Sequence, residues 1–518
     1  MSEHDEKNTV KSIKSPKWLV FLFIISIIWG FYLRIYQLDH QSYWLDESFT
    51  VNAALEIMEK GYPLLDSGQP YKHGLINTYV VAATIKTFGY SHWATRISSV
   101  FWGLGVVIII FLLAKRLFDP LTAFISGLLV NFSLWEIAWS RQARMYAQLQ
   151  FFYFFSLYLF LRFLDKPGAG RLTWLIAATM GAIFSHSFGF FLLPIYLIYA
   201  FIWHRRMLGE KIKFIFKRKN WSIQNYLLAG VIILSLIWLL KLSVKTWDTV
   251  SNLASIKIDT YLTYQAYSVE LYHPLLLAAL VGVALALFKQ RVKQTWLLLI
   301  GFLLPYISIL IISYRIEFRY LFFIFPIILI LASYFLTSFF KSMANLTRVR
   351  MIQKISGALA VLAAIIFIIL SPQFIYQPKN FFALEKGIPQ PNYRAAYDFI
   401  KNHADFTPDA IILSPLPAMD KVYGLKTNYW LPISLTRRTE DFYKQLTPDG
   451  EREIYTNTPL IKTAEDLAAI INNNHGFIWL DQFSWARLPK DYRDLIQQQE
   501  LVFLNTNQKD ERVWVVKF

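Results

Sequence analysis

"WLVFLFIISIIWGFYLRIYQLDHQSYWLDES", Trp18–Ser48, begins as an unbroken apolar run and ends close to two adjacent carboxylates, Asp46 and Glu47. Bulky aromatic residues continue to Tyr36, where a cleaved signal peptide would instead end in small residues. The lysine-containing segment before Trp18 indicates a cytoplasmic N-terminus. The stretch therefore predicts a retained membrane anchor, with an acidic pair shortly after the first crossing.

The composition is that of a membrane protein. The chain has 518 residues, of which 55% are hydrophobic, and its mean hydropathy is +0.37. The formal charge of +17 lies mainly in short basic segments between apolar runs, which favours membrane topology over a nucleic-acid partner. Cysteine is absent, which excludes disulfides, thiolate metal sites and cysteine nucleophiles.

The remaining apolar runs predict a polytopic α-helical membrane protein with about 11 transmembrane helices. One run, Leu172–Trp203, is too long for a single span and is expected to turn back at Ser185–Phe190. The other runs are 97–114, 121–139, 145–161, 226–244, 274–288, 295–314, 320–340 and 355–371.

Alternate loops carry the basic residues, which predicts a multi-pass protein of the plasma (inner) membrane with these loops in the cytoplasm. The opposite, outer loops include 37–96, 245–272 and everything after Pro372. From Gln373 to Phe518 the composition becomes that of a soluble α/β domain, with helices at "YRAAYDFIKNHADF" and "TAEDLAAIINNN", strands at "DAIILSP" and "HGFIWLD", and a closing hairpin. We therefore predict a membrane domain, 1–372, whose outer loop one is 37–96, and an extracytoplasmic α/β domain, 373–518.

Counting crossings places several chemically active residue types at the outer face of the membrane. They are Asp46, Glu47, Arg141, Arg144, Tyr146, His186, Glu317 and Arg319. Each residue also has a structural explanation: an acid can cap a helix, an arginine can anchor at the interface, Glu317 and Arg319 can pair, and a histidine can pack. Only their coincidence at one face favours a reaction site.

Loop one is expected to hold two helices on the membrane surface. "AALEIMEKGY" and "GLINTYVVAATIKTFGYS" both have an apolar face, and turn residues with Lys72 and His73 lie between them. Such helices would hold the acidic pair and a cation at the depth of the lipid headgroups.

The sequence resembles the GT-C fold membrane glycosyltransferases, in particular glycosyltransferase family 39 with its protein O-mannosyltransferase and aminoarabinose transferase branch. The resemblance lies in "WLDES", in the segment from "QPYKHG" to "LLAKRLF", in "SRQARMYAQLQFF" and in "EFRYLFFIFP", which contains Tyr320. It covers about the first 165 residues well and residues 317–326 moderately. In the remainder only the helix pattern matches.

The resemblance implies transfer of a sugar from a polyprenyl-phosphate donor to a protein, lipid or glycan acceptor at the outer face. It places the catalytic carboxylate at Asp46, with Glu47 beside it. It places Arg144 near the donor phosphate, with Arg319 and Lys72 as weaker candidates. Relatives often have "PP" and a nearby acid where this chain has "PYKHG", which leaves Lys72 and His73 less well matched.

The residue types suit this chemistry. A carboxylate within about 3 Å of the acceptor hydroxyl can take its proton, and arginine can stabilise the departing phosphate. A single displacement would invert the anomeric centre. A divalent ion is possible, because Asp46, Glu47 and His73 carry suitable ligand atoms. Their spacing matches no recognised metal motif, so we commit to no metal or other cofactor.

Two other classes of protein fit the sequence less well. A transporter or flippase of lipid-linked sugars would need charged residues within the spans and inverted repeats, whereas here the apolar runs are nearly free of charge. A membrane anchor for the outer binding domain would need only one crossing.

Overall fold

The computed structural model describes residues 16–203, 273–312, 318–346, 350–378, 392–433, 444–505 and 512–518. The chain divides into two compact units. The first contains Met1–Arg34, Val100–Ser140 and Met145–Pro378, and the second contains Ile35–Ser99, Arg141–Arg144 and Lys379–Phe518. The predicted crossing at 226–244, the outer loop at 245–272 and the candidate Glu317 lie outside the described residues.

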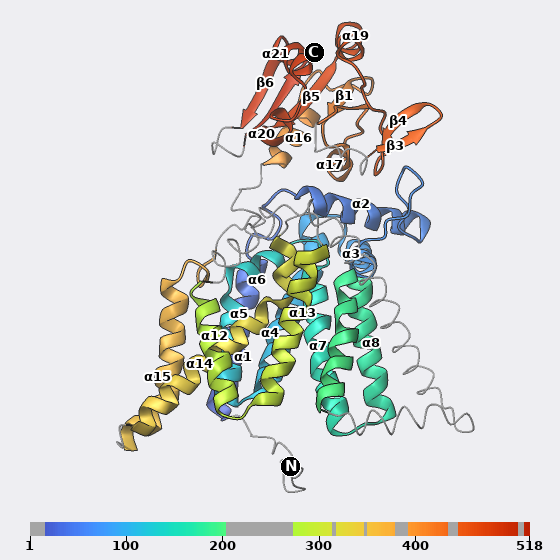
Figure 1. The fold of residues 1–518 in the computed structure, drawn as a ribbon. Helices are drawn as coiled ribbons and strands as arrows, with labels where there is room; N and C mark the ends of the chain where they lie inside the picture. The colour runs from blue at the N-terminus through green and yellow to red at the C-terminus, as the bar shows by residue number, and fades with distance from the viewer. Residues whose placement is uncertain are drawn as a thin grey trace, which may run out of the picture. The chain divides into compact units, whose positions relative to one another are not determined.

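The first unit is helical, and most of its long helices run beside one another (Figure 1). Its helices are α1 (Lys17–Ile35), most of α4 (His92–Leu117), α5 (Pro120–Phe132), α6 (Leu134–Trp139), α7 (Tyr146–Asp165), α8 (Ala169–Ser185), α12 (Leu275–Phe288), α13 (Val292–Ile312), α14 (Phe325–Leu346) and α15 (Arg350–Leu370). Two short 3-10 helices, η2 (Ser187–Phe191) and η5 (Phe318–Ile324), lie in the connections.

Among the described residues, 5 helices are long and apolar enough to cross a membrane. Four of them present large apolar side chains outward, as α1 does with Phe21 and Ile28, both more than 60% exposed. Such surfaces are stable against lipid rather than water. The chain is therefore a multi-pass membrane protein, as predicted. The count of about 11 helices stays a prediction, because part of the helical region lies outside the described residues.

The run Leu172–Trp203 does turn back where it was expected to. α8 ends at Ser185 and η2 follows, and the hydroxyl oxygens of Thr179 and Tyr196 lie 3.3 Å apart across the turn. The run 121–139, predicted as one span, is instead broken at Ser133 into α5 and α6. Ser133 has an extended backbone that bridges to Phe374, and its side chain accepts a hydrogen bond from Glu136 N at 3.4 Å.

The second unit joins loop one to the C-terminal region. Loop one forms α2 (Leu45–Lys60) and α3 (Leu75–Phe88), which confirms the two expected helices. The C-terminal region has a five-stranded sheet in the order β2-β1-β5-β7-β6 and a hairpin of β3 and β4. The strands are β1 (Ile411–Ser414), β2 (Tyr429–Trp430), β3 (Lys444–Thr447), β4 (Gly450–Glu453), β5 (Gly476–Asp481), β6 (Glu500–Asn505) and β7 (Val513–Lys517).

The sheet is parallel from β2 through β1 to β5, and β7 and β6 complete it as an antiparallel hairpin. The helices of this region are α16 (Tyr393–Asn402), α17 (Pro417–Val422), α19 (Ala464–Asn473), α20 (Gln482–Trp485) and α21 (Lys490–Gln497). Every element predicted for the C-terminal region is therefore present. β5 is buried at all positions, as its continuous apolar sequence indicated.

The two units do not coincide with the expected domains 1–372 and 373–518, whose boundary stays a prediction. Loop one packs against the C-terminal region because the two share a core that contains Tyr43 and Val51. Asn52 Nδ2 donates to the carbonyl of Ala418 at 2.9 Å, and Tyr43 N donates to the hydroxyl of Tyr423 at 2.8 Å.

Candidate active site

The acidic pair lies in the first turn of α2. Trp44 has an extended backbone and precedes the helix, and its N–H donates to Glu47 Oε2 at 3.0 Å. The segment "LDES" thus does take part in capping the helix, and the acid whose side chain accepts the Trp44 N–H is Glu47. Both carboxylates still lie where a helix dipole favours negative charge.

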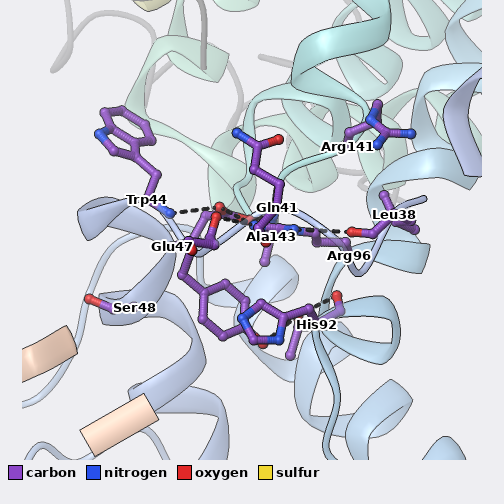
Figure 2. A network of polar contacts seen from close by, with 12 residues as sticks. Leu38, Gln41, Trp44, Glu47, Ser48, His92, Arg96, Arg141 and Ala143 are labelled. Atoms are coloured by element: carbon purple, nitrogen blue, oxygen red, sulfur yellow. Dashed lines mark hydrogen bonds and ion pairs between the residues drawn. The ribbon is translucent and has the colours of Figure 1, made fainter. Parts of the chain in front are cut away.

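Glu47 is a buried structural anchor. Figure 2 shows its carboxylate among Trp44, Arg96 and Ala143. Oε1 accepts from Arg96 Nε at 2.9 Å and from Ala143 N at 2.8 Å, and Oε2 accepts from Arg96 Nη2 at 2.8 Å and from Trp44 N. Its exposed fraction is 1%. Glu47 therefore holds the loop that contains Ala143 against the start of α2, and its oxygens are occupied by protein donors.

Arg96, which was not predicted as a site residue, completes this anchor. Nη1 donates to the carbonyls of Leu38 and Gln41 at 3.0 and 2.9 Å, and Nη2 donates to the carbonyl of Ser42 at 2.9 Å. With Glu47 these acceptors engage all the N–H groups of the guanidinium. In the sequence Arg96 precedes an apolar run, as a topology-determining arginine at the membrane surface also would, so no local signal distinguishes it.

Asp46 and Arg144 form the more accessible half of the site. Arg144 Nη2 lies 3.6 Å from Asp46 Oδ2, and the Asp46 side chain is 18% exposed. Arg144 Nη1 donates to the Asp46 carbonyl at 2.8 Å, to Thr50 Oγ1 at 2.9 Å and to the Tyr71 hydroxyl at 3.1 Å. The guanidinium is thereby fixed beside a carboxylate that solvent can reach. Thr50 and Tyr71 were not predicted, because only folding brings them to Arg144.

Lys72 and His73 directly follow Tyr71 in loop one. The rings of Tyr71 and His73 are 5.7 Å apart, and both His73 and Lys72 are exposed. Partial desolvation, and then the charge of Arg144, lower the pKa of His73. The imidazole is therefore neutral near pH 7, as a hydrogen-bonding group for a polar ligand would be.

Arg141 has a different role from Arg144. Its Nη1 donates to the carbonyl of Tyr36 at 2.7 Å and its Nη2 donates to the carbonyl of Gln37 at 3.2 Å. Arg141 is 4% exposed. Arg141 therefore fixes the backbone at the start of loop one, next to the carbonyls of Leu38 and Gln41 that Arg96 binds.

The other candidates gather in the first unit. The Tyr146 ring lies 5.9 Å from that of His186, and Phe188 lies 4.3 Å from His186 and 5.4 Å from Tyr320. His186 Nδ1 accepts a hydrogen bond from Phe188 N at 3.2 Å, which fixes the turn after α8. Arg319 lies in η5, directly before Tyr320, and is 8% exposed.

The arrangement in the second unit offers a proton acceptor and an anion contact side by side. Asp46 can accept a proton, and Arg144 can bind negative charge by charge-assisted hydrogen bonds. In the described ranges, no group of three or more histidine and carboxylate side chains comes together to hold a metal ion.

Comparisons with known proteins agree with this description. Residues 72–238 match the family model "Dolichyl-phosphate-mannose-protein mannosyltransferase". ArnT from Cupriavidus metallidurans, in its structure bound to undecaprenyl phosphate, is 12% identical with a TM-score of 0.56, over 97% of this chain and 98% of that chain. No match is found among curated proteins.

AglB from Archaeoglobus fulgidus is an oligosaccharyltransferase solved with an inhibitory peptide and a dolichol-phosphate. It is 13% identical with a TM-score of 0.53, over 79% of this chain. The chain covers only 64% of AglB's own length. At this identity the likeness to both solved structures concerns the fold.

The fold is that of the GT-C membrane glycosyltransferases. The family match at residues 72–238 agrees with this fold and with the resemblance to family 39 read from the sequence.

Proposed function

We propose that this protein is an inverting glycosyltransferase that moves a sugar from a polyprenyl-phosphate donor to an acceptor at the outer face of the cytoplasmic membrane. The observation that carries the proposal is the partly exposed Asp46 held beside the buried Arg144. The lipid phosphates in the ArnT and AglB structures support a donor of this class. The basic segments between apolar runs support a cytoplasmic N-terminus and an outer C-terminal domain.

The reaction is a single displacement. The acceptor oxygen forms a bond to the anomeric carbon while the bond from that carbon to the phosphate oxygen breaks, and the bonding electrons leave with the phosphate. Asp46 takes the proton of the acceptor hydroxyl. Arg144 stabilises the charge that develops on the phosphate, because its position is already fixed by Thr50 and Tyr71.

The remaining candidates have supporting roles in this proposal. Glu47 does not touch the substrate but positions Asp46 by anchoring the start of α2. Lys72 and His73 are exposed and available to the donor phosphate or the acceptor. Arg319 remains a candidate for the donor phosphate, with Tyr320 beside it. Phe188 lies between the rings of Tyr320 and His186, and Tyr146 contacts His186.

Asp46→Asn tests the proposal. The amide cannot accept the proton, so transfer is expected to fall to background, while binding of undecaprenyl phosphate by the purified protein persists. Cells that carry the variant should accumulate one polyprenyl-phosphate sugar, measured by mass spectrometry of the lipid extract. Glu59→Gln, which changes an exposed acid on the same helix, is the matched control and should leave transfer unchanged. Near-normal transfer by Asp46→Asn would overturn the assignment.

A further inference from the structure

The second unit contains an apolar cavity of about 120 Å³ that the proposed reaction does not use. Two side chains of α2, Leu45 and Phe49, form one part of its wall, and Trp430, Ile433, Phe483 and the segment 415–418 form much of the rest. Phe483 is 45% exposed, so the cavity reaches solvent at that rim. We call this cavity the α2 pocket. All its lining residues belong to the second unit.

The pocket adjoins the candidate catalytic carboxylate. Leu45 and Phe49 are four residues apart and share one face of α2, and Asp46 directly follows Leu45. Because the helix rises about 1.5 Å per residue, a group in the pocket lies within about one helical turn of Asp46 along the axis. Two or three residues of extended chain, at about 3.3 Å each, span such a distance.

One polar residue, Glu453, lies in the otherwise apolar wall. It is 3% exposed, and Oε2 accepts hydrogen bonds from Tyr455 N at 2.9 Å, Thr456 N at 2.7 Å and Thr456 Oγ1 at 2.8 Å. All of these bonds end on Oε2. Within the part of the chain that the structure describes, Oε1 is therefore left to accept a hydrogen bond from a ligand, for example from a backbone N–H.

The size and chemistry of the pocket select its ligand. An apolar cavity of about 150 Å³ in another protein accommodates benzene, so this one suits a single ring or branched aliphatic group and not an acyl or polyprenyl chain. A sugar would lose hydrogen bonds against these apolar walls. A carboxyl group in the wall disfavours the phosphate of the donor. A bulky apolar side chain of a peptide satisfies all these conditions.

We propose that the α2 pocket binds a leucine- or phenylalanine-sized side chain of a peptide acceptor, placed one to three residues from the hydroxyl that Asp46 deprotonates. This inference rests on the proposed glycosyl transfer and makes its acceptor a protein. The apolar contact sets the register of the peptide, and Glu453 receives a backbone N–H beside it.

Binding of fluorescent peptides to the purified full-length protein tests the pocket independently of transfer. The peptides share one serine and carry leucine, phenylalanine or alanine at each of the three preceding and three following positions in turn. Burial of a side chain of this size predicts affinity about tenfold higher for the best leucine or phenylalanine peptide than for its alanine counterpart. Equal binding of all peptides would overturn the inference.

Two pocket variants give the structural control. Ile433→Trp fills the cavity and should bring the affinity ratio close to one, and Phe483→Ala, at the exposed rim, should lower the ratio without demanding repacking of a buried site. Leu446→Ala removes an apolar side chain that is 82% exposed on β3 and should leave the ratio as in the wild type. An unchanged ratio in both pocket variants would place the binding elsewhere and overturn the inference.

Transfer in membranes that contain the wild-type protein separates the two proposals. Sugar on the serine of the leucine or phenylalanine peptides, in preference to the alanine peptides, supports both. Transfer only to lipid or glycan would overturn the peptide acceptor and leave glycosyl transfer standing. Peptide binding without transfer to any acceptor would overturn the proposed function and not the pocket.

Discussion

At the scale of single residues, two neighbouring carboxylates have opposite environments. Glu47 is buried and its oxygens are occupied by the main chain and by Arg96, whereas Asp46 is partly exposed and contacts Arg144. A buried carboxylate with such partners holds the surrounding backbone in one position. A carboxylate that solvent reaches can take a proton from a bound hydroxyl group. The sequence predicted the pair as a site, but only the fold separates the two roles.

Glu47→Gln is expected to destabilise the protein where Asp46→Asn does not. The amide nitrogen would face donor N–H groups and leave the buried Arg96 without its counter-charge. Breaking one partner of a buried ion pair costs about 3–5 kcal/mol. Thermal unfolding in detergent, followed by tryptophan fluorescence, should show a clear drop in midpoint for Glu47→Gln alone. Equal midpoints for the two variants would remove the anchoring role.

Tyr71→Phe is expected to weaken the hold on Arg144. The substitution deletes the hydroxyl that lies 3.1 Å from Nη1 and leaves the contact with Thr50 intact. Because one of several bonds to a charged group is lost, affinity for undecaprenyl phosphate should fall by a factor of about 3–10, and Arg144→Ala should reduce it further.

The control for this prediction is Tyr79→Phe. The Tyr79 hydroxyl is exposed and donates to the carbonyl of Gly61 at 3.3 Å, away from Arg144. Its loss should leave affinity for undecaprenyl phosphate unchanged. An unchanged affinity in both Tyr71→Phe and Arg144→Ala would remove Arg144 from the phosphate site.

Among the helices and strands, the apolar periodicity of the sequence correctly predicted those whose formation depends on neighbouring residues. The apolar spacing of "YRAAYDFIKN" and "AEDLAAIINN" gives α16 and α19, and the continuous apolar run "GFIWLD" gives β5. It failed at Ser133, where an apolar run predicted one continuous helix. The break there depends on Gln373 and Phe374, which lie more than 230 residues further along the chain.

The end of β4 predicts a pH-dependent stability. Burial raises the pKa of Glu453 to about 7 from an ordinary value of 4.5. The folded state then binds a proton more tightly than the unfolded state, so this contribution to stability is complete below pH 4.5 and is lost as the pH rises to about 7. The total is about 3 kcal/mol at most.

Glu453→Gln tests this dependence. Glutamine keeps an oxygen for the N–H groups of Tyr455 and Thr456 but does not titrate. The fall in unfolding midpoint between pH 4.5 and 7.5 should therefore be smaller in the variant than in the wild type. A shallower fall must remain, because burial also raises the pKa of Asp420 to about 6. Identical pH profiles would contradict the protonation of Glu453.

At the scale of the whole molecule, the class of protein was readable from the sequence and the construction of the site was not. Apolar runs and basic loops predict a multi-pass membrane protein without reference to any long-range contact. The site depends on contacts between distant segments: Glu47 pairs with Arg96, 49 residues away, and with Ala143, 96 residues away. Such pairings are set by packing and leave no periodic trace in one sequence.

Removal of the C-terminal region after Pro378 is expected to abolish transfer, although Asp46, Arg144 and Arg319 all remain. Loop one shares a core with this region: Tyr43 and Val51 belong to the same cluster as Tyr397 and Leu413. The truncation would expose that apolar surface and remove the partners of Tyr43 and Asn52.

Limited proteolysis of membranes that contain the truncated chain should show cleavage in loop one, which the full chain resists. The reason is that local stability depends on buried apolar contacts. Transfer and proteolysis measured on the same membranes then distinguish the mechanism. If the region only recognises the acceptor, loop one stays protected and transfer alone is lost. Near-normal transfer by the truncated chain would show instead that α2 and Arg144 hold their geometry without the shared core.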